Sequence, residues 1–146
     1  MASIAKRIYD ISKVEDIYFD EVEEGFNYPS FYFPPVEQEA LGDTLLTFKY
    51  DNALFVKVFE KSTTEAMSLA HRVVDALTRD KNRIAFVNED GTYSGDKFRT
   101  RDISYKSIDK GVAQIYFRWS SIHEYDQPTY SKTVKTIFNI STKEVL

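Results

Sequence analysis

The most regular hydrophobic pattern in the chain is a stripe at helical spacing that follows Ser62. Its apolar members recur every three or four positions: Ala66, Met67, Leu69, Ala70, Val73, Val74 and Leu77. The preceding Ser62-Thr63-Thr64-Glu65 is typical of a capping box, in which the serine hydroxyl and the glutamate carboxylate satisfy free amides. We therefore predict a helix from Ser62 to about Thr78 that packs across one face of a sheet.

A shorter stripe opens the chain. Ile4, Ile8 and Ile11 fall on one face at helical spacing, and Ser3 is placed to cap the first turn. Residues 3–13 are therefore predicted to form a short helix. A helix of this length is only marginally stable in isolation, so we expect it to pack against an apolar surface.

Alternation of apolar and polar positions predicts the strands. Gly111–Ile122 alternates best, with inward residues Ala113, Ile115, Phe117 and Trp119 and outward residues Gln114, Tyr116, Arg118 and Ser120. Phe98–Ser107 is predicted to pair with it as a hairpin across Ile108–Lys110. Both faces of Ala53–Glu60 are fairly apolar, which predicts a central strand covered on each side.

Weaker patterns fill the rest of the chain. Thr44–Tyr50 is predicted as a strand, interrupted at Asp51-Asn52, and Glu37–Asp43 as a polar connection. Ile84–Val87 is a short apolar run, and residues 88–96 are predicted as an exposed loop with glycine turns. Thr133–Ile140 alternates again and predicts a last strand, which either closes its own sheet or reaches a neighbouring subunit.

The segment Asp16–Phe33 contains two aromatic-rich runs around a turn with Gly25 and Pro29. We predict a hairpin of strands 15–22 and 30–36, the second ended by Pro34-Pro35. Its acidic side chains require one face that meets water or a complementary partner.

These elements predict an α+β fold. Its sheet is mixed and mostly antiparallel, made of two hairpins and a central strand, and packed by an N-terminal helix and a longer middle helix. We predict one domain over residues 1–126, followed by a C-terminal strand or arm over residues 127–146.

Charge is segregated along the chain. The net charge is -4, but nine acidic and no basic residues lie between Val14 and Phe48. Basic residues gather later: Arg79, Lys81, Arg83, Lys97, Arg99, Arg101, Lys106 and Lys110. Two such patches allow head-to-tail packing of copies. The alternative is that they pair within one subunit or are simply solvated.

No motif in the sequence predicts catalysis, a cofactor or a metal site. The chain has no cysteine, and His71 and His123 with scattered carboxylates give no zinc-ligand spacing. No nucleophile elbow or phosphate-binding glycine loop is present. Neither a signal peptide nor a membrane span is predicted. Lys97–Arg101 interleaves cationic and aromatic side chains as nucleic-acid strands do, but the sequence pI of about 5.2 opposes phosphate binding.

The first predicted hairpin resembles a known family. The string Tyr18-Phe19-Asp20-Glu21-Val22-Glu23-Glu24-Gly25-Phe26, then Pro29-Ser30-Phe31, resembles a pattern in tail terminator proteins of tailed phages and prophage elements. Leu41-Gly42-Asp43 and the order of elements are also similar, over residues 3 to about 125. The chain departs from the family at Glu24, where glutamine is frequent, and in a longer segment after Tyr130.

The resemblance implies a structural virion protein and no enzyme: a tail terminator whose hexameric ring caps the tail tube and joins it to the head connector. Implied partners are further copies of the chain, the tail tube protein, the connector or neck protein and, in contractile tails, the sheath protein. DNA would pass the lumen without specific binding, and no membrane is involved. The ring would be assembled in the host cytoplasm and would reside in the tail or neck of the virion.

Two surfaces are then expected at interfaces. Asp20, Glu21, Glu23 and Glu24 would face a neighbouring subunit or the lumen, and Arg99 and Arg101 would meet the adjoining subunit. Two alternatives stay open at this point: another neck or connector component, and a small ligand-binding or enzymatic α+β domain.

Overall fold

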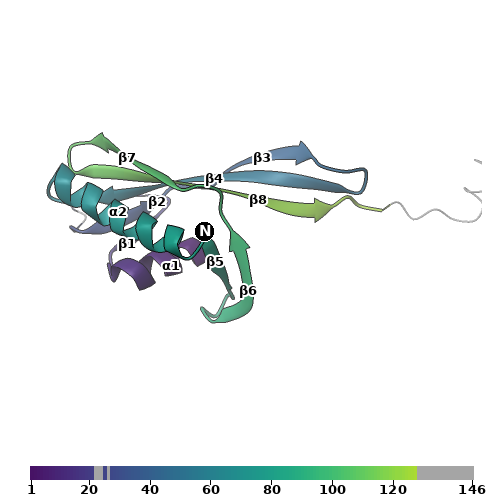
Figure 1. The fold of residues 1–146 in the computed structure, drawn as a ribbon, viewed down its shortest axis with the longest axis horizontal. Helices are drawn as coiled ribbons and strands as arrows, with labels where there is room; N and C mark the ends of the chain where they lie inside the picture. Colours follow the sequence, from purple (N-terminus) through teal and green to yellow (C-terminus); the bar gives the residue numbers. More distant parts are fainter. Residues whose placement is uncertain (22–24, 26, 128–146) are drawn as a thin grey trace, which may run out of the picture.

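The computed structural model describes residues 1–21, 25 and 27–127. Two helices and eight strands follow one another in these ranges (Figure 1). In chain order they are α1 (Ala2–Ser12), β1 (Ile17–Phe19), β2 (Ser30–Phe33), β3 (Glu37–Gly42), β4 (Thr47–Phe59), α2 (Thr63–Arg79), β5 (Arg83–Val87), β6 (Tyr93–Arg99), β7 (Ser104–Asp109) and β8 (Val112–Glu124).

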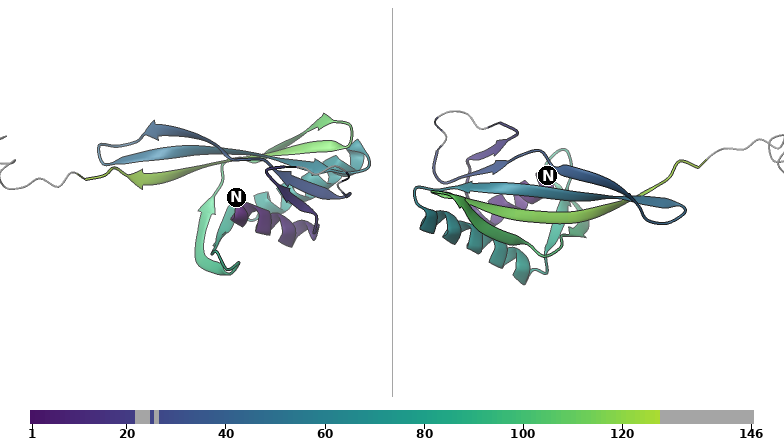
Figure 2. Two further views of the ribbon diagram at one scale, coloured as in Figure 1. Left: turned by 180° about the vertical axis from the view of Figure 1, so that it is seen from behind. Right: turned by 90° about the horizontal axis from the view of Figure 1, so that it is seen from above.

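The main sheet is built on the long antiparallel pair β4 and β8, which stay paired along their whole length. Its strand order is β1-β2-β4-β8-β7, and β3 also pairs with β4. All pairs are antiparallel except β1–β2, which is parallel. Strands β5 and β6 form a separate antiparallel pair beside α1. Both helices lie on the same face of the main sheet (Figure 2).

The core lies between that face and the helices. Its fully buried members are Ile4 and Ile8 of α1, Phe31 and Phe33 of β2, Leu54, Val56 and Val58 of β4, Ala66, Ala70, Val73 and Leu77 of α2, Ile84 of β5, and Ala113, Ile115 and Phe117 of β8. Each strand contributes alternate positions and each helix one stripe, as the two periodicities require. The predicted fold class is therefore confirmed, together with both helices and the β7–β8 hairpin.

The prediction that β4 would be covered on each side is wrong. Phe55, Lys57 and Phe59 alternate with the core residues and stay half-buried on the face opposite the helices. The Phe55 ring stacks on Tyr116 of β8 with centroids 4.9 Å apart. Cross-strand stacking therefore accounts for apolar side chains on a face that no described helix covers.

The two aromatic-rich strands β1 and β2 are parallel, whereas an antiparallel hairpin was predicted for them. Ile17 lies opposite Phe31 and Phe19 opposite Phe33. Asp20 leaves β1 with a positive φ of 62°, so the chain departs from the strand direction instead of reversing tightly. As predicted, β2 ends directly before Pro34-Pro35.

Two predictions about the middle of the chain are also wrong. The polar segment 37–42 is strand β3, whose mostly exposed side chains suit an edge strand. The predicted interruption at Asp51-Asn52 is absent, and β4 runs straight through it. Asn52 is buried at this point. Its side-chain oxygen accepts a hydrogen bond from Gln38 Nε2 at 2.8 Å, and its side-chain NH2 group donates to the Trp119 carbonyl at 3.4 Å. These bonds satisfy a polar side chain inside a strand.

Three smaller differences concern the ends of elements. Residues 93–96 belong to β6 instead of a loop, and the predicted strand 98–107 is divided between β6 and β7. Ser3 lies inside α1, where its hydroxyl accepts the Val87 N–H at 3.1 Å and does not cap the helix. The predicted strand Thr133–Ile140 lies outside the described residues.

Candidate interaction surface

The strands β3, β4 and β8 extend together beyond the helices (Figure 1). We call this part the β-finger: residues 37–42 of β3, 47–52 of β4 and 119–124 of β8, with the turn 43–46 at its tip. It is continuous with the main sheet, so the same ladder of backbone hydrogen bonds supports it. The β-finger is therefore a continuous projection of the sheet.

The turn at the tip is held by local hydrogen bonds. The Leu46 and Thr47 N–H groups donate to Thr44 Oγ1 at 3.2 and 3.0 Å, and the Thr47 hydroxyl donates to Asp43 Oδ2 at 3.0 Å. The Tyr125 N–H donates to the Leu46 carbonyl at 2.9 Å. The tip backbone is thus fixed by its own side chains.

The tip presents apolar side chains to solvent. Leu45 is 98% exposed, Leu46 62% and Ile122, on the neighbouring strand, 66%. Single exposed apolar residues are ordinary, but a fixed turn that displays adjacent leucines is a typical contact surface. The sequence offered one signal for it, a Leu-Leu pair directly after the turn residues Asp43-Thr44. The tip was not predicted, because Thr44–Tyr50 was predicted as a strand.

One face of the β-finger carries an aromatic cluster. Phe48 stacks on His123 at 5.5 Å between centroids and meets Tyr125 at 5.2 Å. Tyr50 lies edge-on to His123 at 5.3 Å. These positions continue the core-facing side of β4 and β8 beyond the helices. The cluster thus takes the place of helix packing in the β-finger.

The opposite face of the β-finger carries a polar network around Asp51. Its carboxylate accepts the Ser120 hydroxyl at 2.5 Å and lies 3.5 Å from Arg101 Nη2 and 3.9 Å from Arg118 Nη2. The Ser120 hydrogen bond, assisted by the nearby Arg101, Lys49 and Arg118, lowers the pKa of Asp51. Asp51 therefore stays ionised at neutral pH and ties Arg101 to the sheet.

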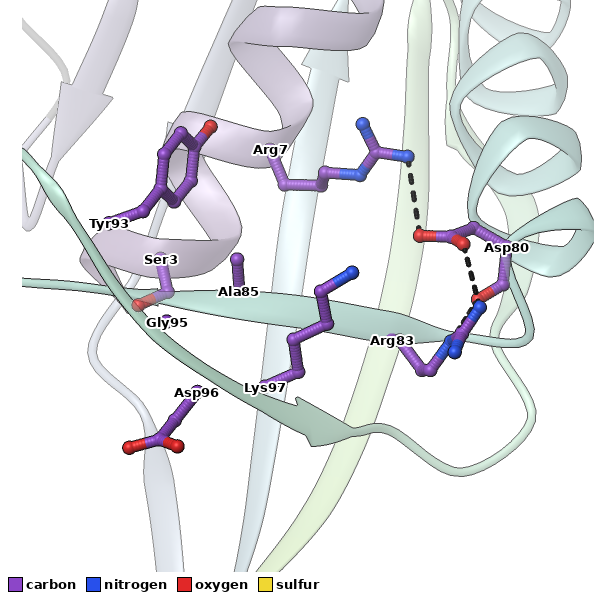
Figure 3. Close-up of a pocket in the computed structure, with 9 residues that line it drawn as sticks. All are labelled: Ser3, Arg7, Asp80, Arg83, Ala85, Tyr93, Gly95, Asp96 and Lys97. Atoms are coloured by element: carbon purple, nitrogen blue, oxygen red, sulfur yellow. Dashed lines mark hydrogen bonds and ion pairs between the residues drawn. The ribbon is translucent and has the colours of Figure 1, made fainter.

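A groove of about 350 Å³ lies on the body of the molecule, between α1 and the β5–β6 pair (Figure 3). Its lining residues are Ser3, Arg7, Asp80, Arg83, Ala85, Tyr93, Gly95, Asp96 and Lys97. One wall is fixed by the Tyr93 hydroxyl, which donates to Asp10 Oδ2 at 2.6 Å. That hydrogen bond raises the pKa of Tyr93 above its usual value.

The charged side chains of the groove form ion pairs centred on Asp80. Asp80 pairs with Arg83 at 3.2 Å and with Arg7 at 3.8 Å, so one carboxylate serves two guanidinium groups. Lys97 extends toward these groups, whereas Asp96 points away from them (Figure 3). The lining therefore carries three cationic side chains (Arg7, Arg83 and Lys97) against the two carboxylates of Asp80 and Asp96.

The predicted interface residues are dispersed. Asp20 and Glu21 are exposed directly after β1, while Arg101 lies against β8 and its N–H donates to the Arg118 carbonyl at 2.7 Å. Strands β2 and β4 separate these two positions within the sheet. Arg99 ends β6 in the other sheet and is exposed. Glu23 and Glu24 lie outside the described residues.

The two histidines each lie close to a neighbouring hydroxyl group. His71 Nδ1 lies 2.8 Å from the Tyr105 hydroxyl, and His123 Nε2 lies 3.2 Å from Ser121 Oγ. The first contact links α2 to β7, and the second lies within β8. Within the part of the chain that the structure describes, no three His, Asp or Glu side chains gather as metal ligands. Neither described helix has the length and apolarity needed to cross a membrane.

Comparison with known proteins gives two relatives by sequence. The chain is 36% identical over 115 residues to the phage-like element PBSX protein XkdJ of Bacillus subtilis (strain 168), covering 77% of this chain and 79% of that protein. It is 31% identical over 127 residues to the uncharacterized protein YqbJ of the same strain, covering 87% and 86%. No protein-family model matches the chain.

Among solved structures, the chain is similar to one chain of the virion of a native gene transfer agent particle. That match has a TM-score of 0.46 and 14% identity, and it covers 85% of this chain and 93% of the other.

Proposed function

This chain belongs to the family of the phage-like element PBSX protein XkdJ, and from that premise we propose that it is a structural protein of a phage-type particle, its tail terminator. In this role copies of the chain form a hexameric ring on the finished tail tube. The ring stops tube polymerisation and joins the tail to the head connector. The protein then resides in the tail or neck of the particle and has no catalytic function.

The observation that carries the proposal is the 36% identity to a phage-element protein along 77% of the chain. The motif from Tyr18 to Phe31 adds the resemblance to tail terminators in particular. The shape of the molecule supports an assembly role, because the β-finger projects an apolar tip away from the core. Exposed apolar surface of this kind is stabilised when a partner covers it.

The partners follow from this role. We propose that the ring binds further copies of itself, the tail tube protein and the connector protein, and the sheath protein if the tail contracts. Residues 127–146 form a separate C-terminal arm in this proposal. DNA passes the lumen without being held, since an acidic inner wall repels phosphate.

We retain the charged residues as interface candidates. Asp20, Glu21, Glu23 and Glu24 are proposed to face a neighbour or the lumen, and Arg99 and Arg101 the adjoining subunit. No ion pair joins Asp20 or Glu21 to either arginine among the described residues, although Arg101 is paired with Asp51. Opposite charges kept apart in one subunit remain available to complement those of another.

The direct test is tube growth. Tail tube protein is polymerised with and without this chain, and the products are imaged by negative-stain electron microscopy. Tubes of limited length with a ring at one end are expected. Unlimited tubes with bare ends would refute the terminator role. A ring that binds the connector but leaves tube growth unchanged would reassign the chain to another neck component.

The charged residues are tested separately by sedimentation. Reversing the charge at Glu21 and Glu23 to lysine is expected to weaken ring formation. The matched control reverses Glu37 and Glu39, two exposed acidic residues at the same spacing on β3. If both pairs weaken the ring equally, a general charge effect is responsible and the assignment of Glu21 and Glu23 is rejected.

A further inference from the structure

We propose that the tip of the β-finger of one subunit inserts into the groove between α1 and β5–β6 of a second copy of this chain. The inference deepens the proposed function and rests on it, because it assigns the contact that joins subunits in the ring. The two surfaces lie on the same chain, and neither has a role in the core. Four observations carry the assignment.

The tip has the properties of an inserting element. Leu45 is almost fully exposed at 98%, although the surrounding backbone is fixed by Thr44, Thr47 and Tyr125. A rigid turn loses little conformational entropy when it docks. Burying Leu45 and Leu46 would remove apolar surface from water, the main driving force for association.

The groove has the properties of a receiving site. Its volume of about 350 Å³ is at the lower end of the range of about 300–1,000 Å³ found for ligand sites. Ala85 contributes a short side chain to its lining. A Cβ atom built at Gly95 would meet nothing within 4 Å, so this part of the groove is open.

The charges of the two surfaces are complementary. The tip carries Asp43, exposed beside the two leucines. The groove holds Arg7, Arg83 and Lys97, and Asp80 is the acceptor for both arginines. An acidic tip would therefore enter a site with unneutralised positive charge, which favours this orientation over tip-to-tip contact.

The geometry requires a second copy. The tip lies at the far end of the β-finger, beyond the helices (Figure 1), whereas the groove is lined by residues of α1, β5 and β6 on the body. A subunit therefore does not fill its own groove. A contact between two different surfaces of identical subunits is heterologous, and such contacts generate a closed ring when the rotation between subunits closes.

The first experiment cross-links the two surfaces. The chain has no cysteine, so Leu45→Cys and Ala85→Cys introduce the only thiols. A short bifunctional thiol reagent applied to assembled rings of the double variant is expected to give a ladder of covalent oligomers that ends at the ring size. Rings without a ladder would overturn the inference. So would covalent dimers from Leu45→Cys alone, because they would show tip-to-tip contact.

The second experiment perturbs the tip. Leu45→Lys, which removes the apolar side chain and carries the same charge as the groove, is expected to weaken subunit association at least tenfold in analytical ultracentrifugation, while circular dichroism stays unchanged. The matched control is Ile108→Lys, the same change at an exposed residue in the β7–β8 turn region at the other end of the sheet. Rings that tolerate Leu45→Lys as well as Ile108→Lys would overturn the inference.

The two proposals fail in different ways. If the wild-type chain forms no ring and leaves tail tubes unlimited, the terminator function fails and the subunit contact fails with it. If wild-type rings cap tubes but neither the cross-link nor the Leu45→Lys effect is found, only the tip-to-groove contact fails. The tip would then be assigned as a contact surface for a different virion protein.

Discussion

Asp51 and Ser120 lie directly opposite each other in β4 and β8 and share a hydrogen bond of 2.5 Å. The bond favours the charged carboxylate, so the pKa of Asp51 falls below its usual 3.8. A lowered pKa in the folded state contributes stability above pH 3.8, and that contribution is lost as the pH falls through the folded-state pKa. We expect Ser120→Ala to raise the pKa of Asp51 toward 3.8, measured by NMR titration of the carboxyl carbon.

The control for this prediction is Ser121→Ala. Ser121 is the next residue of β8, and its side chain lies on the other face, where its hydroxyl contacts His123. Its removal should leave the pKa of Asp51 unchanged. If both variants shift the titration equally, the hydrogen bond from Ser120 is not the main cause of the lowered pKa.

Any substitution that adds a side chain at Gly111 is predicted to destabilise the fold. It has a φ of +72°, and a Cβ atom there would lie 2.6 Å from the Glu60 carbonyl oxygen. The backbone at Glu60 is tied to the same residue by the Glu60 N–H, which donates to the Gly111 carbonyl at 2.9 Å. Gly111→Ala should therefore lower the free energy of unfolding by about 1–3 kcal/mol or more, measured by urea denaturation.

Gly91→Ala separates the two causes. Gly91 has a similar φ of +85°, but nothing lies within 4 Å of a Cβ atom built there. Its substitution carries only the cost of the left-handed backbone, about 1–2 kcal/mol. We expect Gly111→Ala to be clearly more destabilising than Gly91→Ala. Equal losses would mean that the contact with Glu60 relaxes without cost.

Asn52 is predicted to stabilise the base of the β-finger. It is only 3% exposed, and its amide joins β3 to β8 through Gln38 and the Trp119 carbonyl. Asn52→Ala should lower the free energy of unfolding by about 1–3 kcal/mol, because buried hydrogen bonds are lost. Gln38→Ala removes only the first of these hydrogen bonds and should therefore cost less than Asn52→Ala, which removes both. The order of the two losses in urea denaturation is the test.

Asn52 also shows why part of the fold could not be predicted. Adjacent Asp and Asn residues favour turns when only local sequence is considered. In the structure Asp51 bonds across to Ser120 and Asn52 to Gln38, so tertiary partners override the local preference. By contrast, the stripe after Ser62 and the alternation in β8 depend on burial of one face alone. Both were predicted correctly for that reason.

The candidate surface was predictable in part. Exposure of the acidic residues after β1 follows from their charge, and two of them, Asp20 and Glu21, are exposed in the structure. The tip and the groove could not be predicted, because each depends on elements whose pairing the sequence did not reveal. The tip exists because segment 37–42 is a strand that pairs with β4, and the groove because β5 pairs with β6 beside α1.

Ser62 provides the test of the best-predicted element. Its hydroxyl accepts the Glu65 N–H at 3.2 Å at the start of α2, the helix that covers the core. Ser62→Ala leaves that amide without its cap and should lower the free energy of unfolding by about 1 kcal/mol. Thr64→Ala is the control, since Thr64 is exposed in the same first turn and alanine has the higher helix propensity.

Thermal unfolding should therefore show a lower melting temperature for Ser62→Ala and an unchanged or slightly higher one for Thr64→Ala. A melting temperature for Ser62→Ala equal to that of the wild type would show that the cap is not needed, because packing of α2 against the sheet already fixes the helix start.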